Sequence, residues 1–426
     1  MIPIMVALIF IVSMILIIIF KKKRTVIAML AALMLYTLLV LIKGLPFSEF
    51  LQLIDFKTVG LIIGILVTAE VVSESGLFQF LAIKTIKLTK GNDTLLMVIL
   101  CLMGVLLSSI LTAVVTVIIM VRLTLAICKA LDINPIPLLV SIVISMDMGG
   151  SMSMISNTPN IIVAQKAGLS FSFFFLYTTP YALITFFVLI LLFKHYFRKF
   201  GEVDEIRKMI INEFDEWSLV PSRSLFYESI FLILGLVVGF LLVPDPLFVS
   251  LTIATLSIIF MKIDPDTVFD KLDWATMAFL LSMFVIVGAV DEEGLLEPVG
   301  IFLAEISGGS ILMVSLLLIL IVSILNGFLD EVMLALTFIP IITSLAFSGG
   351  FSNQINILWA LLIITTNVGG GLSPISSPIM IFTLSQAKKD GYEIHFKEIG
   401  KIGLIATMIE IGMAALYISV RIVLGI

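Results

Sequence analysis

Long apolar runs, each of about 17–25 residues, follow one another along this chain. A helix of that length spans the hydrocarbon core of a bilayer, because each residue adds about 1.5 Å along the helix axis. Apolar residues make up 60% of the 426 residues and charged residues 13%. A soluble fold of this size has too little interior to hide that much apolar surface. The sequence therefore predicts an all-α polytopic membrane protein in a lipid bilayer, and the long, non-alternating runs argue against a β-barrel.

Charge, cysteine and histidine usage exclude several function classes. The formal net charge of −5 comes with no basic patch, so nucleic acid is not an expected partner. Cys101 and Cys128 lie in apolar runs and are interpreted as buried small hydrophobes. The two histidines, His195 and His395, cannot form a metal cluster, and no cofactor is expected beyond a coupling ion. The sequence has no phosphate-binding Gly-x-x-x-x-Gly-Lys-Ser/Thr loop, which leaves only a separate ATPase subunit open.

The chain divides at its longest polar stretch, which is predicted to be a linker between two halves. The first apolar run is followed by four basic residues and no cleavage site, so it is predicted to be a transmembrane helix, not a cleaved signal. The predicted segments are N-terminal scaffold helices at 1–57, a first repeat at 58–193, the linker at 194–224, further scaffold helices at 225–272 and a second repeat at 273–426.

Landmarks in the two halves recur at a nearly constant offset. The offsets are 218, 218 and 220 residues for the pairs Asp55 and Asp273, Gly76 and Gly294, and Gly149-Gly150 and Gly369-Gly370. A shared offset over three landmarks indicates gene duplication, and duplicated halves are typical of secondary transporters.

Basic residues predict that the two halves are inverted. Four lysines flank the first-half block 94–131, whereas no Lys or Arg occurs between Lys271 and Lys388 in the second half. Since basic loops stay in the cytoplasm, corresponding units are expected to face opposite sides of the membrane. This places the linker 194–224 in the cytoplasm and the amino terminus outside, in a multi-pass protein of the plasma membrane.

Two blocks, 94–131 and 310–347, are too long for one crossing and are interrupted by polar residues at 108–112 and 326–331. Polar groups at that depth are costly unless they face protein or water. Each block is therefore predicted to be a re-entrant hairpin. The alternative is two ordinary helices joined by a tight turn.

Two further runs, 136–167 and 355–387, contain a double glycine followed by hydroxyl residues and prolines. Double glycine is expected to break the helix, and proline suits the first turn of a new one. Each run is thus predicted to be a broken helix, whose unwound carbonyls suit a cation and whose half-helix amino terminus suits an anion. The alternative is a simple loop between short helices. The predicted substrate-binding residues are Ser156, Asn157, Thr158, Asn160, Thr112, Asn326, Asn367, Ser373, Ser376 and Ser377.

Acidic residues inside the apolar runs are candidates for binding the coupling ion, a proton or a sodium ion near Asp330. These candidates are Asp330, Asp147, Glu331 and Glu70, with Asp147 expected at the start of the first unwound loop. Glu410, in the last helix, is interpreted as structural. Thr112-Ala113 stands where the second tip has Asp330-Glu331, which favours a single asymmetric coupling site.

The motifs resemble those of the arsenite-permease and NhaD-type antiporter branch of the ion transporter superfamily, which also holds citrate and dicarboxylate transporters and the melanosomal P protein. The resemblance covers about residues 25–423 and is carried by 73–84, 109–122, 134–137, 149–160, 167–171 and 369–378. It implies two inverted repeats, each with a re-entrant hairpin and a broken helix. It also implies a scaffold, often a homodimer, and a transport domain that moves like an elevator. Relatives usually carry Asp-Asn at each hairpin tip, so the departures here leave proton and sodium coupling both open.

Taken together, the residues predict a secondary active transporter that moves a small anion or oxyacid, arsenite-, citrate- or dicarboxylate-like, with H⁺ or Na⁺. A Na⁺/H⁺ antiporter is the rival, because acids outnumber bases in the core. An ion channel is disfavoured by the duplicated hairpins and the absence of a repeated charged ring. No enzyme activity is expected, since Ser156 has no neighbouring histidine in sequence and no matched aspartate pair appears.

Overall fold

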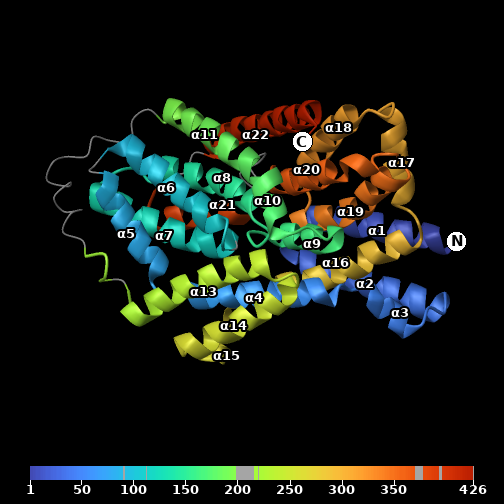
Figure 1. The fold of residues 1–426 in the computed structure, drawn as a ribbon, viewed down its shortest axis with the longest axis horizontal. Helices are drawn as coiled ribbons and strands as arrows, with labels where there is room; N and C mark the ends of the chain where they lie inside the picture. Colours follow the sequence, from blue (N-terminus) through green and yellow to red (C-terminus); the bar gives the residue numbers. More distant parts are fainter. Residues whose placement is uncertain are drawn as a thin grey trace.

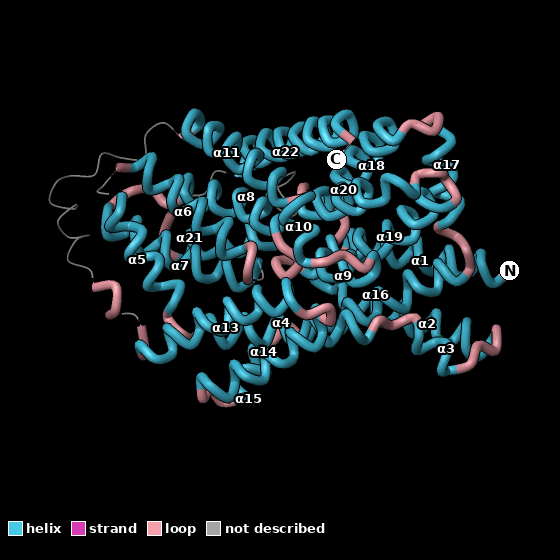
Figure 2. The backbone as a smooth tube through the Cα atoms, viewed as in Figure 1, coloured by secondary structure: helices cyan, strands magenta, loops and turns pink. Residues whose placement is uncertain are grey.

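The computed structural model describes residues 1–89, 92–111, 113–197, 215–218, 220–369, 378–392 and 396–425, which form an elongated bundle of helices (Figures 1 and 2). These residues contain no β-strand. Seven helices among them are long and apolar enough to cross a membrane: Ile2–Ile19, Lys21–Ile42, Phe56–Ser73, Thr179–Tyr196, Arg223–Leu242, Trp274–Glu292 and Ile399–Leu424. The prediction of an all-α polytopic membrane protein is therefore confirmed.

The helices before the linker are α1 (Ile2–Ile19), α2 (Arg24–Tyr36), α3 (Phe47–Gln52), α4 (Phe56–Ser73), α5 (Leu77–Thr89), α6 (Asp93–Ser108), α7 (Ala113–Leu131), α8 (Ile136–Met152), α9 (Thr158–Ala167), α10 (Phe171–Tyr177) and α11 (Thr179–Tyr196). Those after it are α13 (Arg223–Leu242), α14 (Pro246–Met261), α15 (Pro265–Lys271), α16 (Trp274–Glu292), α17 (Glu297–Ile306), α18 (Ile311–Asn326), α19 (Glu331–Phe347), α20 (Ile355–Asn367), α21 (Pro378–Lys389) and α22 (Phe396–Leu424). Short 3-10 turns at Lys21–Lys23 and Ser352–Gln354 and a π-helical turn at Thr37–Ile42 complete the described elements.

The two halves share an order of helices with a constant spacing. The helices α4, α6 and α7 begin 218 residues before α16, α18 and α19. The caps follow the same spacing, because Asp55 accepts from the backbone N–H of Thr58 and Asp273 from that of Thr276, each at 3.0 Å. Such caps satisfy donors that the first helical turn leaves free. The inverted orientation of the halves and the elevator motion stay predictions.

Helix breaks fall inside each of the four long blocks. In the hairpin blocks α6 ends at Ser108 before α7 begins at Ala113, and α18 ends at Asn326 before α19 begins at Glu331. The runs that carry the glycine motifs divide into α8 with α9 and into α20 with α21. Whether the two hairpins are re-entrant in the bilayer stays a prediction.

The prediction that Gly149-Gly150 breaks its helix is wrong, because α8 continues to Met152 and the backbone becomes extended only at Ser153. A Cβ atom on Gly149 would lie 2.3 Å from the carbonyl oxygen of Val105 on α6. A Cβ atom on Gly150 would lie 2.6 Å from Oδ1 of Asn367 on α20. The two glycines therefore allow close packing inside a helix, and Asp147 lies within α8 instead of opening the loop.

Helices from the two halves interleave. The first-half helix α9 packs against α4, α19 and α20, and α8 packs against α6, α11 and α20 (Figure 1). The amino-terminal helix α2 packs along α16. Large apolar side chains on outer faces are exposed, among them Phe231, Leu242 and Val423, as expected for helices in lipid. This interleaving brings the break between α8 and α9 to the start of α19 and the end of α20.

Candidate functional site

The break between α8 and α9 leaves α9 as a short half-helix whose amino terminus lies at the break. Asn157 has an extended backbone and caps α9, its Oδ1 accepting from the backbone N–H of Thr158 at 3.0 Å. Pro159 occupies the first turn, where its missing N–H removes no helical hydrogen bond. The first turn of α9 therefore presents donors and a partial positive charge toward its cap.

Three asparagines join the ends of α9, α19 and α20. The amide nitrogen of Asn157 donates to Oε2 of Glu331 at 2.8 Å and to Oδ1 of Asn367 at 3.1 Å. The amide nitrogen of Asn367 in turn donates to Oδ1 of Asn160 at 2.9 Å. We call Asn157, Asn160, Glu331, Asn367 and Ser156 the polar site. Four of its members come from the two sequence motifs and one from a hairpin tip, so the fold unites residues up to 211 positions apart.

Ser156 and Asn160 hold the loop itself. The Ser156 hydroxyl contacts the carbonyl oxygens of Gly150 and Ser153, each at 2.6 Å. The Asn160 amide donates to the same two carbonyl oxygens at 2.6 and 2.8 Å. Both side chains are fully buried, so they shape the loop, whereas Asn157 and its neighbour Thr158 are only half-buried.

Asn326 plays the corresponding part in the second half. Its amide nitrogen donates to the carbonyl oxygens of Thr365, Thr366 and Val368 at 3.3, 2.8 and 2.7 Å. These are carbonyls at the carboxyl end of α20, where a helix lacks donors of its own. The backbone then turns at Gly369, whose φ of +127° suits only glycine. The predicted site residues Ser373, Ser376, Ser377 and Thr112 lie outside the described residues.

Asp330 forms the amino-terminal cap of α19 and an ion pair with a residue that the sequence did not single out. Its Oδ1 accepts from the backbone N–H of Val332 at 3.0 Å, and its Oδ2 pairs with Nη1 of Arg24 on α2. The guanidinium carbon of Arg24 also lies 5.1 Å from the centre of the Phe279 ring. Arg24 was interpreted only as the last of four basic residues after the first run. Its one distinguishing signal is that it begins the next apolar run, which carries it inward.

Asp147 extends the acidic character of the site. It lies in the last two turns of α8, half-buried, within electrostatic range of Glu331 and of Glu410 on α22. The polar site and its immediate surroundings therefore contain three carboxylates and one guanidinium group, those of Asp147, Asp330, Glu331 and Arg24. Of the four predicted coupling residues, Glu331 thus belongs to the polar site, and Asp330 and Asp147 lie near it.

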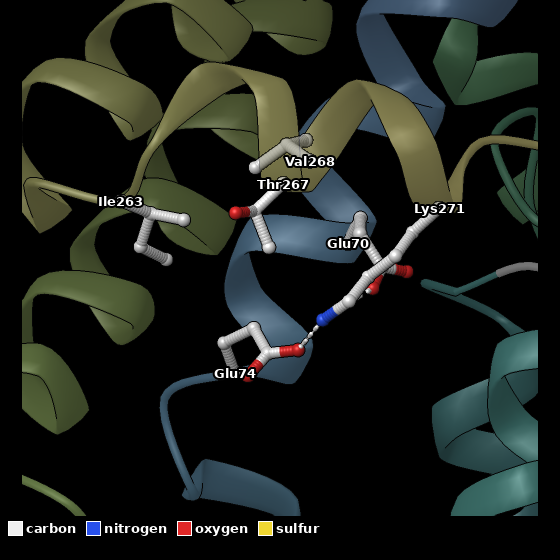
Figure 3. Close-up of a pocket in the computed structure, with 6 residues that line it drawn as sticks. All are labelled: Glu70, Glu74, Ile263, Thr267, Val268 and Lys271. Atoms are coloured by element: carbon white, nitrogen blue, oxygen red, sulfur yellow. Dashed lines mark hydrogen bonds and ion pairs between the residues drawn. The ribbon is translucent and has the colours of Figure 1, made fainter.

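Glu70, the fourth predicted coupling residue, lies elsewhere. Its Oε1 is 3.6 Å from Nζ of Lys271, which also pairs with Glu74 (Figure 3). The contact with Glu74 raises the pKa of Lys271 above its ordinary value, so this lysine stays cationic. These residues line a pocket of about 90 Å³ between α4 and α15. Glu70 therefore has its own basic partner, apart from the polar site.

Comparison with known proteins gives one family and several relatives. The family model described as "Citrate transporter" matches residues 14–364 and 244–424. A "46 kDa membrane protein" of Mycobacterium leprae is 27% identical, covering 86% of this chain and 87% of the relative. The P protein of Mus musculus is 25% identical, covering 93% of this chain and 58% of that protein.

One solved structure supports the fold. The YdaH transporter of Alcanivorax borkumensis superposes with a TM-score of 0.60, covering 87% of this chain and 86% of that one. Because only 13% of residues are identical, the likeness concerns the fold alone.

Proposed function

Since the chain belongs to the citrate transporter family and is a membrane transporter, we propose that it carries a small anion with carboxylate groups, of the citrate or dicarboxylate kind, together with protons. The observation that carries this proposal is the Asn157 amide at the amino terminus of α9, which donates to the carboxylate of Glu331 and to Asn367. An amide and a helix amino terminus directed at a carboxylate are what a carboxylate substrate requires.

Glu331 and Asp330 occupy the acceptor positions that a substrate carboxylate would take. Glu331 accepts from Asn157, and Asp330 pairs with Arg24. A substrate that binds these donors displaces the protein's own carboxylates. A displaced carboxylate in a poorly hydrated site is costly while it is ionised, so it takes up a proton. Binding of the anion and binding of the proton are then linked at one place.

Alternating exposure of this site completes the proposed cycle. Asn157 and Asn367 bind the anion, whereas Glu331, Asp330 and Asp147 hold the coupling charge. A coupled carrier must bind its substrate differently in the two exposures, and here protonation of the displaced carboxylates supplies that difference. The proposed setting is the plasma membrane, with the linker 194–224 in the cytoplasm, the amino terminus outside and a homodimeric scaffold.

Uptake into proteoliposomes tests the proposal. The purified protein is reconstituted with a pH dye inside, an inward proton gradient is set, and radiolabelled citrate, succinate or arsenite is added outside in turn. We expect saturable uptake of a carboxylate anion accompanied by internal acidification. Asn157→Ala should abolish this uptake, while Asn353→Ala, at an exposed position of the 3-10 turn, should leave it unchanged. Saturable uptake of arsenite alone would replace the carboxylate with an oxyacid, and no uptake of any of them would refute the proposal.

A Na⁺/H⁺ antiporter is the second candidate, because the described site has three carboxylates against one guanidinium. Sodium added outside liposomes loaded at acidic pH would then raise the internal pH without any anion. Asp330→Asn separates the two functions, since an antiporter should lose all exchange. An anion carrier with this substitution should still exchange labelled for unlabelled citrate when no proton gradient is applied.

A further inference from the structure

Glu410 on α22 is a buried carboxyl group that the proposed function does not use. Glu410 is 1% exposed, and among the described residues neither of its carboxylate oxygens has a hydrogen-bond partner. The hydroxyl of Thr407, one helical turn earlier on the same face, is also buried with no partner in the part of the chain that the structure describes. An ionised carboxylate left in this state loses its hydration without compensation, which is costly.

The helices that pack against α22 offer Glu410 no described base. They are α8, α11, α18 and α20, and their titratable groups facing Glu410 are Asp147 on α8 and Tyr181 on α11. The Tyr181 hydroxyl donates to the backbone carbonyl oxygen of Glu410 at 3.1 Å and so leaves the carboxyl group unsatisfied. The described parts of α18 and α20 contain no charged residue. Along α22 itself, the nearest basic residues are Lys401 and Arg421, at least two turns away.

Asp147 connects Glu410 with the polar site. It is the one described carboxylate within electrostatic range of Glu410 on one side and of Glu331 on the other. Asp147 is half-buried on α8, Glu410 is fully buried on α22, and these two helices pack against each other. Two adjacent buried carboxylates repel each other when both are ionised, and a shared proton removes that repulsion.

We propose that Asp147 and Glu410 form a proton-binding pair behind the polar site, in which the two carboxyl groups hold one proton between α8 and α22. The pair would store the transported proton away from the anion. Its role in coupling rests on the proposed function, whereas the presence of the shared proton does not. When the anion displaces Glu331 from Asn157, the negative charge near Asp147 moves and the proton passes between the pair and the polar site.

Infrared difference spectroscopy of the full-length protein in liposomes tests the pair without requiring transport. Protein at neutral pH is compared with protein at alkaline pH, and the carbonyl stretching band of a protonated carboxylic acid is followed. We expect the wild type to show this band and Glu410→Gln to lose it. Glu305→Gln, which changes an exposed carboxylate at the end of α17, is the matched control and should keep it. A band of unchanged intensity in Glu410→Gln would overturn the proposal, as would loss of the wild-type band on adding sodium at fixed pH.

A second variant, Asp147→Asn, tests the pair even if Glu410→Gln does not fold. In Asp147→Asn the remaining carboxyl of Glu410 can no longer share its proton and no longer faces a neighbouring negative charge, so its band should shift in frequency and disappear at a lower pH than in the wild type. An unshifted band with unchanged pH dependence would refute sharing. In the uptake assay, Glu410→Gln should lose concentrative uptake driven by the proton gradient and keep citrate exchange. Should the wild type carry no carboxylate anion at all, the proposed function fails while the spectroscopic result still decides the pair.

Discussion

At the scale of residues, asparagine amides hold together helix ends that would otherwise expose unsatisfied backbone groups. Asn326 donates to three carbonyls at the end of α20, and Asn160 donates to two carbonyls in the break between α8 and α9. An amide can serve in this way because it carries two donors and an acceptor and no charge that needs neutralising. Inside a bilayer no water is available to replace these hydrogen bonds.

Replacing Asn326 with alanine should therefore destabilise the protein. The substitution leaves the carbonyls of Thr365, Thr366 and Val368 without their side-chain donor, which we expect to cost about 1–3 kcal/mol. The apparent melting temperature in detergent, followed by tryptophan fluorescence, measures the effect. Asn353→Ala is the control, because its exposed side chain makes no described hydrogen bond and its change should stay within about 0.5 kcal/mol. Equal melting temperatures for the two variants would contradict this role of Asn326.

Arg24 should be needed for the charge balance of the second hairpin tip. Replacing it with glutamine leaves Asp330 half-buried with only its backbone cap, and removing one partner of a partly buried ion pair is costly. We expect at least a tenfold loss of anion uptake, equivalent to about 1.4 kcal/mol. Lys22→Gln, in the neighbouring 3-10 turn, is exposed and should behave as wild type. Equal uptake by the two variants would exclude a role for the ion pair.

At the scale of elements, glycine has opposite effects in the two related motifs. In α8 the double glycine lies inside a helix and permits contact with α6 and α20, whereas in the second motif α20 ends at Asn367 and Gly369 follows the extended Val368 with a φ of +127°. Sequence alone predicts a break in both places, because glycine is a poor helix former. Tertiary packing overrides that preference in α8, since close helix approach rewards a missing side chain.

Gly149→Ala should destabilise the contact between α6 and α8. The added Cβ would lie 2.3 Å from a backbone oxygen, which cannot rotate away as a side chain does, so we expect a loss of about 1–3 kcal/mol. Gly412→Ala in α22 is the matched control, because a Cβ there meets no atom within 4 Å. That control should be neutral or stabilising by up to about 1 kcal/mol. A stabilising Gly149→Ala would show that the glycine is not needed for packing.

At the scale of the whole molecule, the matching helix order makes the predicted inversion testable. Asn92 and Ser310 are exposed caps of α6 and α18, 218 residues apart, and so occupy equivalent positions in the two halves. The native Cys101 and Cys128 are fully buried and should not react with a membrane-impermeant maleimide. In intact cells, Ser310→Cys should be labelled from outside and Asn92→Cys only after permeabilisation. Labelling of both from the same side would refute inverted repeats.

Local periodicity and composition were enough to predict the type of fold, the repeat spacing and the family. Apolar run length specified membrane-spanning helices, and the 218-residue offset between Asp55 and Asp273 marked the equivalent starts of α4 and α16. The family resemblance predicted from the motifs is confirmed by the match to the citrate transporter family. The sequence also marked three asparagines as candidate site residues, because polar residues inside an apolar run need a protein partner. They are Asn157, Asn160 and Asn367.

Only the tertiary structure decided which distant groups meet. The packing of α2 near the start of α19 pairs Arg24 with Asp330. The packing of α8 against α22 places Asp147 near Glu410, whose carboxylate oxygens have no hydrogen-bond partner among the described residues. The separation of Glu70 from the polar site depends on α15 placing Lys271 beside it. Helical periodicity determines which face of its own helix a residue occupies, but not which helix packs against that face. The charge partners of a buried residue are therefore decided by the fold as a whole.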